Sequence, residues 1–300
     1  MQKNILITGC SSGIGYATAK ILRQDNWRVY TSCRSAEDVA RLRAEGFHCL
    51  QLDITSDEQI QTAFDTVLSE FGHLDALFCN AGYGQTGAAE DISRTALHEQ
   101  FNTNVFGTWQ CINVAMKIFR RQQYGRILVN SSILGYAAMP WRSAYNSSKF
   151  ALEGLCDTLR LETHASGIYI SLLEPGPIAT RFRPNALVKF KQYIDVENSV
   201  HRAAYQAQLN RLQATSSVAP FTLTAEQCAS VCARALNAHK PKARYPVTVP
   251  AHLFWYLKKI FPITWLDWLC RKAVSKQGSN SSSICLKQAI PKIQNNTIVR

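Results

Sequence analysis

The sequence lacks a signal peptide at its start. Its first residues, MQKNILITGC, pass directly into a short apolar stretch and a glycine-rich turn, without a charged region, an apolar run and a small-residue cleavage site. We therefore expect a cytoplasmic protein. The Asn-X-Ser sequons at Asn130 and Asn146 matter only in a secreted chain, so no glycans are expected there.

Metal ligands at metal spacing are also missing. Cys228 and Cys232 stand four residues apart in a helical pattern, but no histidine or second cysteine pair accompanies them at the spacing of a zinc site. We predict no metal. Disulfides are not expected either, because several of the ten cysteines end apolar, strand-like runs where reduced cysteine is a small hydrophobe: Cys10, Cys33, Cys49 and Cys79.

Acidic residues are almost absent from the end of the chain. Residues 239–300 hold 11 lysines and arginines and one acid, Asp267, whereas the first 238 residues hold 22 basic and 20 acidic residues. The net charge of +12 is therefore almost wholly C-terminal. A basic, aromatic surface can meet nucleic acid, but the sequence contains no recognition module for it, and we predict no nucleic-acid partner.

Short apolar segments alternate with helical patterns along the first 250 residues. The apolar segments are KNILITG, WRVYTSC, HCLQLDI, LDALFCNAG, GRILVNSS, IYISLLEPG and RYPVTVP. A chain of 300 residues, 46% of them hydrophobic, can bury one large core. The pattern predicts an α/β fold with a doubly wound, parallel, seven-stranded sheet of the Rossmann type, as a single domain with a C-terminal amphipathic helical extension.

The unusual polar and turn residues fall where the predicted strands end. They are Gly9, Arg34, Asp53, Asn80, Ser132 and Pro175. The carboxyl ends of parallel strands share one edge of a sheet, and the ligand of a doubly wound fold lies beyond that edge. Tyr145 and Lys149 open the helix after the fifth strand and should point into the same crevice.

The stretch TGCSSGIG, residues 8–15, joins the first strand to the first helix. It departs from the G-x-G-x-x-G fingerprint, because three residues and then one residue separate its glycines. In this context, backbone N–H groups and the helix dipole can hold a pyrophosphate. We predict that a dinucleotide binds at Gly9, Ser11, Ser12, Gly13, Ile14 and Gly15.

An arginine stands where NAD-binding folds often have an acid. The second strand ends VYTSCRS, with Cys33 and Arg34 at the place where an acid takes the ribose hydroxyls of NAD. A guanidinium matches phosphate with two parallel hydrogen bonds, so Arg34 favours NADP(H). The plain alternative is a surface arginine.

Tyr145 and Lys149 lie one helical turn apart in SAYNSSKFALEG. A phenol titrates near ~10, and one adjacent cation lowers a pKa by about 1–3 units, which is borderline for proton transfer near pH ~7. The positive charge of an oxidised nicotinamide would close the gap. By itself the pair could also be surface decoration.

Taken together, these residues resemble the short-chain dehydrogenase/reductase family over residues 3 to about 250. The matching motifs are T-G-x-x-x-G-x-G, N-A-G at 80–82, Asn104, Ser132, Y-x-x-x-K and P-G at 175–176. The resemblance implies cofactor contacts at the adenine, beside the fourth strand and around the nicotinamide amide. Asp53 and Ile54 would flank the adenine. Asn80, Ala81 and Gly82 would line the cofactor beside the fourth strand. The nicotinamide amide would be bracketed by Pro175, Gly176, Ile178 and Thr180.

The resemblance also implies four catalytic residues. Tyr145 would be the general acid in carbonyl reduction, and Ser132 would hydrogen-bond the substrate oxygen. Lys149 would lower the pKa of the phenol and hold the nicotinamide ribose, and Asn104 would anchor a water of the proton relay. Ser131 competes with Ser132, but the spacing of thirteen residues to Tyr145 favours Ser132.

Residues 181–223 form a long insertion at the place where family members build a mobile lid over the substrate. Phe182 would contribute to an apolar underside, although packing of the helices on the domain explains the same residues. We expect Phe182 and Leu134 to contact the substrate together with Ser132 and Tyr145. The substrate would then be an apolar carbonyl compound or alcohol.

Residues 251–275 form a basic, aromatic, amphipathic segment that includes AHLFWYLKKIFPITWLDWLCRKAV. Pro262 divides it, and neither half approaches the ~18 apolar residues needed to span a bilayer, whereas its composition suits an interfacial helix. The segment could contact a membrane surface, pack over the substrate pocket or join a dimer. Residues 276–300 lack a periodic apolar face and are expected to be disordered.

Within the family, EPGPIATRF, KPKARYPVT and the basic end look most like hydroxysteroid and retinol dehydrogenases and bacterial NADP-dependent aldehyde reductases. We expect an NADP(H)-dependent reductase that transfers a hydride to a hydrophobic aldehyde or ketone, or the reverse from the alcohol. One alternative is a ketoacyl-carrier-protein reductase, and another is a non-enzymatic NADP-binding sensor or membrane scaffold. Family members pair through helices at residues 93–123 and 145–165, so a homo-oligomer is expected.

Overall fold

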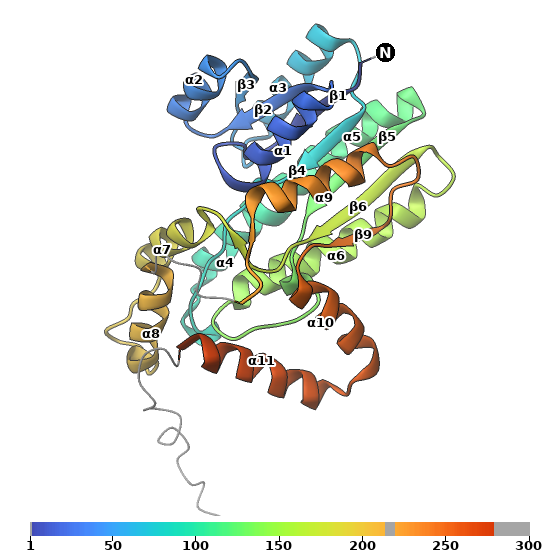
Figure 1. Ribbon diagram of the computed structural model, residues 1–300. Helices are drawn as coiled ribbons and strands as arrows, with labels where there is room; N and C mark the ends of the chain where they lie inside the picture. Colours follow the sequence, from blue (N-terminus) through green and yellow to red (C-terminus); the bar gives the residue numbers. More distant parts are fainter. Residues whose placement is uncertain (1, 214–219, 279–300) are drawn as a thin grey trace, which may run out of the picture.

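The computed structural model describes residues 2–213 and 220–278. Seven strands form its main sheet: β1 (Asn4–Ile7), β2 (Arg28–Cys33), β3 (His48–Gln51), β4 (Ala76–Cys79), β5 (Gly125–Asn130), β6 (Ile168–Glu174) and β9 (Arg244–Pro246). Their order across the sheet is β3-β2-β1-β4-β5-β6-β9, and every neighbouring pair is parallel (Figure 1). The predicted doubly wound, parallel, seven-stranded sheet is confirmed.

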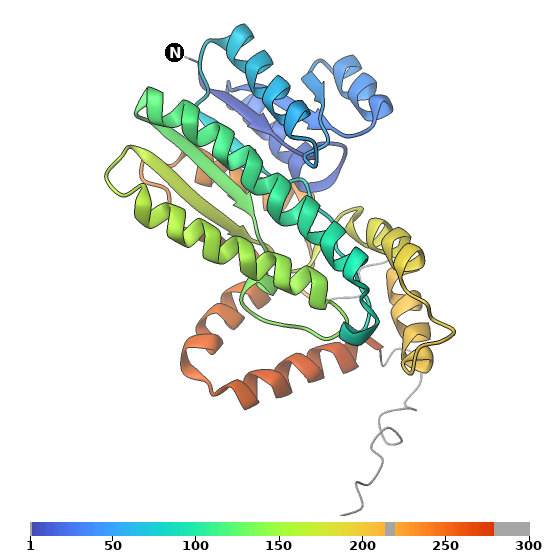
Figure 2. The ribbon, with the colours of Figure 1, turned by 180° about the vertical axis from the view of Figure 1, so that it is seen from behind.

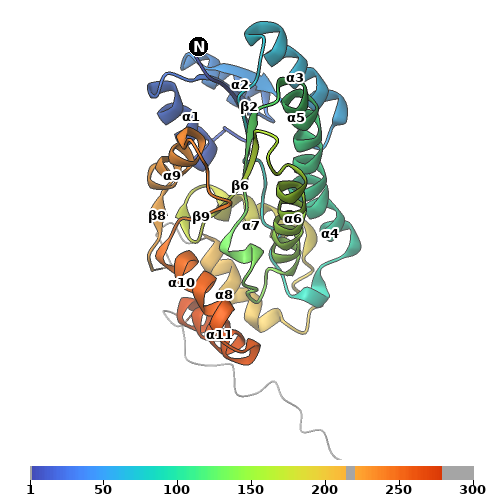
Figure 3. The ribbon, with the colours of Figure 1, turned by 90° about the vertical axis from the view of Figure 1, so that its right-hand side faces the viewer.

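Helices cover both faces of this sheet. The helices of the described residues are α1 (Gly13–Gln24), α2 (Ala36–Ala44), α3 (Asp57–Phe71), α4 (Arg94–Phe101), α5 (Thr108–Gln122), α6 (Ser143–Glu162), α7 (Phe182–Tyr193), α8 (Arg202–Gln213), α9 (Ala225–Asn237), α10 (Val249–Ile260) and α11 (Ile263–Gly278). α3, α5 and α6 lie on one face, and α1 and α9 on the other (Figures 2 and 3).

Side chains of successive strand residues enter two different cores, because strand side chains alternate between the faces of a sheet. Leu6 and Leu77 pack with α3 and α5, whereas Ile5 and Phe78 pack with α1 and α9. Both faces are buried, so the central strands are apolar at consecutive positions, as parallel sheets require. This explains why the strands appear in the sequence as short continuous apolar runs.

The order of the strands reverses between β1 and β4. Ile5 pairs with Ala76 and Leu6 with Leu77, although the two strands are far apart in the sequence. At such a switch point the connections leave β1 and β4 in opposite directions, and a crevice opens beyond their carboxyl ends. The glycine-rich stretch and residues 80–82 follow these two strands and therefore meet there.

Two features at the carboxyl edge were not predicted from the sequence. A small parallel sheet of β7 (Ile178–Ala179) and β8 (Leu223–Thr224) joins the two ends of the lid insertion. A π-helical turn, η2 (Asn102–Gly107), separates α4 from α5. Two-residue strands leave no periodicity in a sequence, and single π-turns arise from local packing and are frequent at functional sites.

The C-terminal part of the chain forms α10 and α11 at the carboxyl edge of the sheet, beside α8 (Figure 1). α11 continues to Gly278, past the expected end of the amphipathic segment at residue 275. The remainder of the expected disordered tail, residues 279–300, lies outside the described residues. Every cysteine in the described ranges is buried and free, including Cys228 and Cys232.

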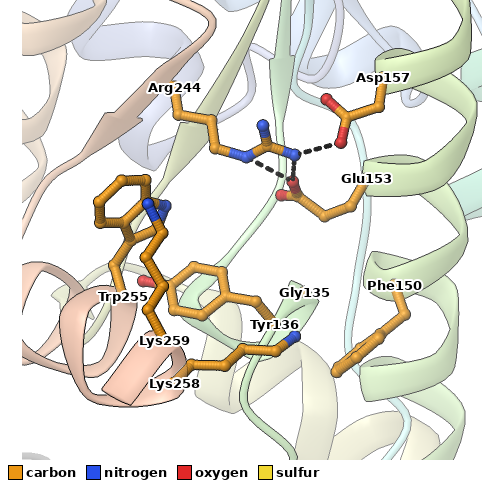
Figure 4. Close-up of a pocket in the computed structure, with 9 residues that line it drawn as sticks. All are labelled: Gly135, Tyr136, Phe150, Glu153, Asp157, Arg244, Trp255, Lys258 and Lys259. Carbon is orange, nitrogen blue, oxygen red and sulfur yellow. Dashed lines mark hydrogen bonds and ion pairs between the residues drawn. The ribbon is translucent and has the colours of Figure 1, made fainter.

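One arginine connects the last two strands to α6. Arg244 in β9 contacts the carboxylates of Glu153 at 2.9 Å and Asp157 at 2.6 Å, both on α6 (Figure 4), and that of Glu174 in β6 at 3.0 Å. Glu174 is fully buried, and this burial raises its pKa to about 8, with Glu153 acting in the same direction. Arg244 therefore supplies a positive charge to the buried Glu153 and Glu174 as well as to Asp157, whose side chain is 38% exposed.

Replacing Arg244 with methionine is expected to lower the free energy of unfolding by about 3–5 kcal/mol, because the buried carboxyl groups of Glu153 and Glu174 lose the guanidinium group that contacts them. Arg160→Met is the matched control, since Arg160 also contacts Asp157, at 3.1 Å, but is exposed. It should cost less than about 1 kcal/mol. Urea unfolding of both variants tests this, and equal losses would contradict the role of Arg244.

Candidate active site

The turn after β1 approaches the segment after β4 more closely than a side chain would allow. Gly9 has φ +71°, and a Cβ on it would lie 2.7 Å from Cα of Ala81. A Cβ on Gly15 would lie 2.5 Å from Nδ2 of Asn80. These positions need glycine, and the spacing of the glycines in the sequence follows from this contact.

The residues at the start of α1 fit the pyrophosphate of a dinucleotide. Ser12 is the N-cap residue, but its side chain makes no capping hydrogen bond, and the first turn contains no acid. The N–H groups and the positive end of the helix dipole are thus left for an anion. Gly13, with φ +64°, lies against Thr180, whose Cγ2 would be 3.1 Å from a Cβ at that position.

Asn80 ties the glycine turn to the neighbouring strands. Its Nδ2 donates to the carbonyl oxygens of Thr8 at 3.1 Å and Gly9 at 2.9 Å. Its Oδ1 accepts from Nδ2 of Asn130 at 3.0 Å, and the carbonyl oxygen of Asn130 accepts from Nζ of Lys149 at 2.6 Å. A continuous chain of hydrogen bonds therefore runs from the cofactor turn to α6.

Asn130 is a site residue that the sequence analysis missed. It ends β5, two residues before Ser132, and it joins Asn80 to Lys149. The available signal was its position, because it is a polar residue at the carboxyl end of a central strand. In the sequence, Asn130 was noted only for its Asn-X-Ser glycosylation sequon.

Asn104 lies in the π-turn η2 and is buried. Its Oδ1 accepts from the N–H of Tyr83 at 3.1 Å, and its Nδ2 donates to the carbonyl oxygen of Tyr83 at 2.9 Å and to Oγ of Ser148 at 3.2 Å. Both N–H groups of Nδ2 are thereby used in joining the segment after β4 to α6, whereas Oδ1 accepts one hydrogen bond of the two it can take. The free lone pair of Oδ1 and the main chain are left for the water that the resemblance implies.

Ser132 and Tyr145 lie at the carboxyl end of β5 and the start of α6. Oγ of Ser132 accepts from the N–H of Leu134 at 3.1 Å and lies 3.4 Å from the carbonyl oxygen of Pro175. Burial raises the pKa of Tyr145 to about 12, against the hydrogen bond with Ser132 and the charge of Arg142, which both lower it. The phenol is thus held protonated, as a proton donor requires.

The side chain of Ser131 points to a different part of the molecule. Its Oγ donates to Oε1 of Glu153 at 2.5 Å and so belongs to the cluster around Arg244. Of the two adjacent serines, only Ser132 has a hydroxyl that hydrogen-bonds with the phenol of Tyr145. This geometry favours Ser132 over Ser131 for contact with a substrate oxygen.

Lys149 is buried below Tyr145, and its Nζ lies 5.6 Å from the centre of the phenol ring. Burial lowers the pKa of Lys149 to about 8, although the carboxylate of Glu153 acts in the opposite direction. Its ammonium group points to the carbonyl of Asn130 at 2.6 Å rather than to the phenol oxygen. Arg142, which precedes α6 and was not predicted, is the cation that acts on the pKa of Tyr145.

The residues expected at the adenosine lie at the ends of β2 and β3. Arg34 is exposed beyond β2, and its carbonyl oxygen accepts from Gln51 at 3.2 Å. Oδ1 of Asp53 accepts from the N–H and the hydroxyl of Thr55 at 3.0 and 2.8 Å, so it caps its own turn. Ile54 is buried, and its carbonyl oxygen would lie 2.2 Å from a Cβ on Gly107 in the π-turn.

Arg41 is a second basic residue near the glycine turn that the sequence analysis missed. Its Nη2 donates to the carbonyl oxygen of Ser11 at 2.7 Å, and its guanidinium contacts Asp38 at 3.0 Å and Glu45 at 2.9 Å. The contact with Ser11 depends on how α2 packs on the turn. No pattern in the sequence indicates it.

Phe182 and Leu134, the two apolar residues expected to contact the substrate, occupy different environments. The ring of Phe182, at the start of α7, lies edge-on to Tyr145 with centroids 5.2 Å apart, and it is 37% exposed. Leu134 is buried in a cluster with Ala251 and Phe254 of α10. Phe182 is therefore available at the phenol, whereas Leu134 mainly supports the loop after Ser132.

Known sequences resemble this chain over most of its length. The sequence model of a family described as short chain dehydrogenase matches residues 3–188. An uncharacterized oxidoreductase, YbbO, of Escherichia coli K12 is 37% identical over 264 residues, which cover 87% of this chain and 91% of that protein. Human 17-beta-hydroxysteroid dehydrogenase type 1 is 34% identical over 258 residues, covering 81% and 77%.

Solved structures share the fold. The structure described as ElxO with NADP bound has a TM-score of 0.66 and 26% identity, and the match covers 82% of this chain and 97% of that chain. A short-chain dehydrogenase/reductase from Burkholderia phymatum, in complex with NAD, has a TM-score of 0.73 and 23% identity, with coverages of 95% and 98%. Structures with this fold thus hold either nicotinamide dinucleotide.

Gly9→Ala is expected to weaken binding of a nicotinamide dinucleotide by more than about tenfold, because the new Cβ must push the backbone at Ala81 out of the crevice. Gly72→Ala is the matched control, since Gly72 also has a positive φ, +76°, but no atom within 4 Å of an added Cβ. Quenching of tryptophan fluorescence by NADPH measures both affinities. Similar losses in the two variants would mean that backbone strain, and not the contact at Ala81, is responsible.

Proposed function

The chain belongs to the short-chain dehydrogenase/reductase family, and on this premise we propose that it is an NADP(H)-dependent reductase of hydrophobic aldehydes or ketones. It would also oxidise the corresponding alcohols in the reverse direction. The observation that carries this proposal is the chain of hydrogen bonds from the glycine turn through Asn80 and Asn130 to Lys149, next to Tyr145. It fixes a proton donor at a set distance from a dinucleotide site.

Arg34 supports NADP(H) over NAD(H). It follows β2 directly, it is exposed, and Ser35 and Ala36 after it carry no acid that could take the ribose hydroxyls. A guanidinium at this point can meet a phosphate with two hydrogen bonds, which a hydroxyl pair cannot match. The reductive direction follows from the usual reduced state of cellular NADP.

In the proposed reaction Tyr145 gives its proton to the carbonyl oxygen of the substrate, while Ser132 donates a hydrogen bond to the same oxygen. The nicotinamide, when bound, supplies the hydride. Burial keeps the phenol protonated, and Ser132 and Arg142 stabilise the phenolate that is left. Lys149, fixed by Asn130, would hold the nicotinamide ribose, and Asn104 would anchor a water.

The surroundings of the phenol support an apolar substrate. Phe182 faces Tyr145, and the cluster that carries Leu134, Met139 and Phe254 packs against the same tyrosine. Binding of a hydrocarbon chain here would bury apolar surface, worth about 0.8 kcal/mol for each methylene group. We therefore expect affinity to rise with chain length.

Oxidation of NADPH with a series of straight-chain aldehydes tests the proposal. We expect faster turnover with NADPH than with NADH, kcat/KM rising with chain length, and a loss of about 10²–10⁴-fold in Tyr145→Phe. Arg34→Ala should lower kcat/KM with NADPH by about tenfold and leave NADH turnover unchanged.

Two results would contradict this function. Faster turnover with NADH would remove the role of Arg34. If NADPH bound but no free aldehyde were turned over, two alternatives would remain, a reductase of carrier-bound ketoacyl substrates and a non-enzymatic sensor. Turnover of a ketoacyl thioester on an acyl carrier protein would then identify the reductase.

Alcohol oxidation is expected to rise with pH, because it needs the phenolate of Tyr145, and reduction to fall as pH rises through the same pKa. Arg142→Met removes a positive charge that lowers this pKa, so the midpoint should move to higher pH. Arg142→Lys keeps the charge and should keep the midpoint. Profiles of kcat/KM against pH measure the shift, and identical midpoints for Met and Lys variants would count against it.

A further inference from the structure

One face of α10 is apolar and points away from the protein. Val249, Leu253, Tyr256 and Ile260 recur every three or four residues, so they form one stripe along the helix. Their exposed fractions run from 52% to 74%. A soluble domain normally buries such a stripe, and an exposed one marks an interaction surface.

The opposite face of α10 is the one that holds the helix in place. Ala251 is fully buried against Leu134, and Phe254 packs in the same cluster. The hydroxyl of Tyr136 donates to the carbonyl oxygen of Ala251 at 2.7 Å. The exposure of the outer stripe is therefore fixed by contacts on the inner face.

α11 also exposes large apolar side chains, among them two tryptophans. Ile263, Trp265 and Trp268 are 74%, 60% and 49% exposed, and the ring of Trp265 stacks on Phe261 at 5.6 Å. Tryptophan and tyrosine side chains have an apolar body and a polar N–H or O–H group, which suits the boundary between lipid headgroups and acyl chains.

Cations accompany these two helices. Residues 249–272 carry Lys258, Lys259, Arg271 and Lys272 against the single acid Asp267. Nζ of Lys258 lies 5.3 Å from the centre of the Phe150 ring on α6, so this lysine faces the domain and not the outer stripe (Figure 4). Nζ of Lys259 lies 3.3 Å from the centre of the Trp255 ring, and Nζ of Lys272 lies 4.0 Å from that of Trp268 (Figure 4 shows Lys259 and Trp255). Positive charge next to aromatic rings is the pattern of helices that lie in an anionic membrane surface.

We propose that α10 and α11 dock this protein on the surface of a lipid bilayer that contains anionic lipids. The outer stripe of α10 and the tryptophans of α11 would enter the headgroup region, and Lys259, Arg271 and Lys272 would contact lipid phosphates. Within residues 2–213 and 220–278, no helix is long and apolar enough to cross a membrane. The docking is thus interfacial.

Charge favours a bilayer over a second copy of the chain. A two-fold contact would bring the same surface of each copy together, with Lys259, Arg271 and Lys272 against the single acid Asp267 on each side. Like charges would then face one another, whereas anionic lipids neutralise them. α11 also contacts α8, so the docked surface lies next to the lid insertion.

Sedimentation of the full chain with vesicles tests the proposal. We expect it to sediment with phosphatidylcholine vesicles that contain phosphatidylglycerol and far less with phosphatidylcholine alone, and to be released as salt is raised. Trp265→Ser with Trp268→Ser should reduce binding to the anionic vesicles by about tenfold or more. Arg271→Gln with Lys272→Gln should reduce the preference for anionic lipid.

The matched control is Tyr124→Ser with Leu161→Ser, which removes two exposed apolar side chains at the other end of the molecule. It should bind vesicles like the unmodified protein. Far-UV circular dichroism and NADPH binding establish that each variant is folded.

Three outcomes would overturn the proposal. They are no binding of the unmodified protein to anionic vesicles, equal binding by the tryptophan variant, and equal loss of binding in the control. Light scattering separates the rival occupant, because a dimer held by these helices would dissociate in the tryptophan variant while vesicle binding stayed unchanged. These measurements need no substrate, so they do not depend on the proposed reaction.

Discussion

The site depends on one physical constraint, which is that polar side chains at the carboxyl ends of β4 and β5 hydrogen-bond to one another and to the turn after β1. Asn80 meets the carbonyls of the glycine turn, Asn130 meets Asn80, and Lys149 meets Asn130. Each unmade hydrogen bond here would leave a buried polar group at a cost of about 1–3 kcal/mol. The network therefore fixes α6, and with it Tyr145, relative to the cofactor turn.

Burial shifts the pKa values of Tyr145 and Lys149, both on α6, in opposite directions. It raises the pKa of Tyr145 and lowers that of Lys149, because a charge on either group loses contact with water. We expected Lys149 to lower the pKa of the phenol directly, but its ammonium group is turned to the main chain of Asn130. Arg142 lowers the pKa of the phenol, and the ammonium group of Lys149 lies 5.6 Å from the centre of its ring.

The loop after Ser132 connects the chemistry to the C-terminal helices. Ser131, next to Ser132, joins the cluster of Glu153 and Arg244, while Leu134 and Tyr136 hold α10. α10 thus has an inner face that supports the active-site loop and an outer face that stays exposed. Packing on the domain and an exposed apolar surface therefore occur together on opposite faces of one helix.

The sequence by itself determined the fold class and the set of residues at the carboxyl edge. Apolar runs of strand length, each followed by a helical pattern, have few solutions other than a parallel sheet covered on both faces, and the chain order then assigns Gly9, Asn80, Ser132 and Tyr145 to one rim. These inferences rest on periodicity and order, which are local properties.

Only the tertiary structure decided the contacts between segments far apart in the chain. Several of these contacts leave no periodic signal in the sequence, because each depends on packing across elements. They are the link of Asn130 to both Asn80 and Lys149, the charge of Arg142 near the phenol, the contact of Arg41 with Ser11 and the π-turn at Asn104. The exposure of one face of α10 is of the same kind. Its amphipathic pattern is in the sequence, but which face the domain covers is set by the loop on which the helix packs.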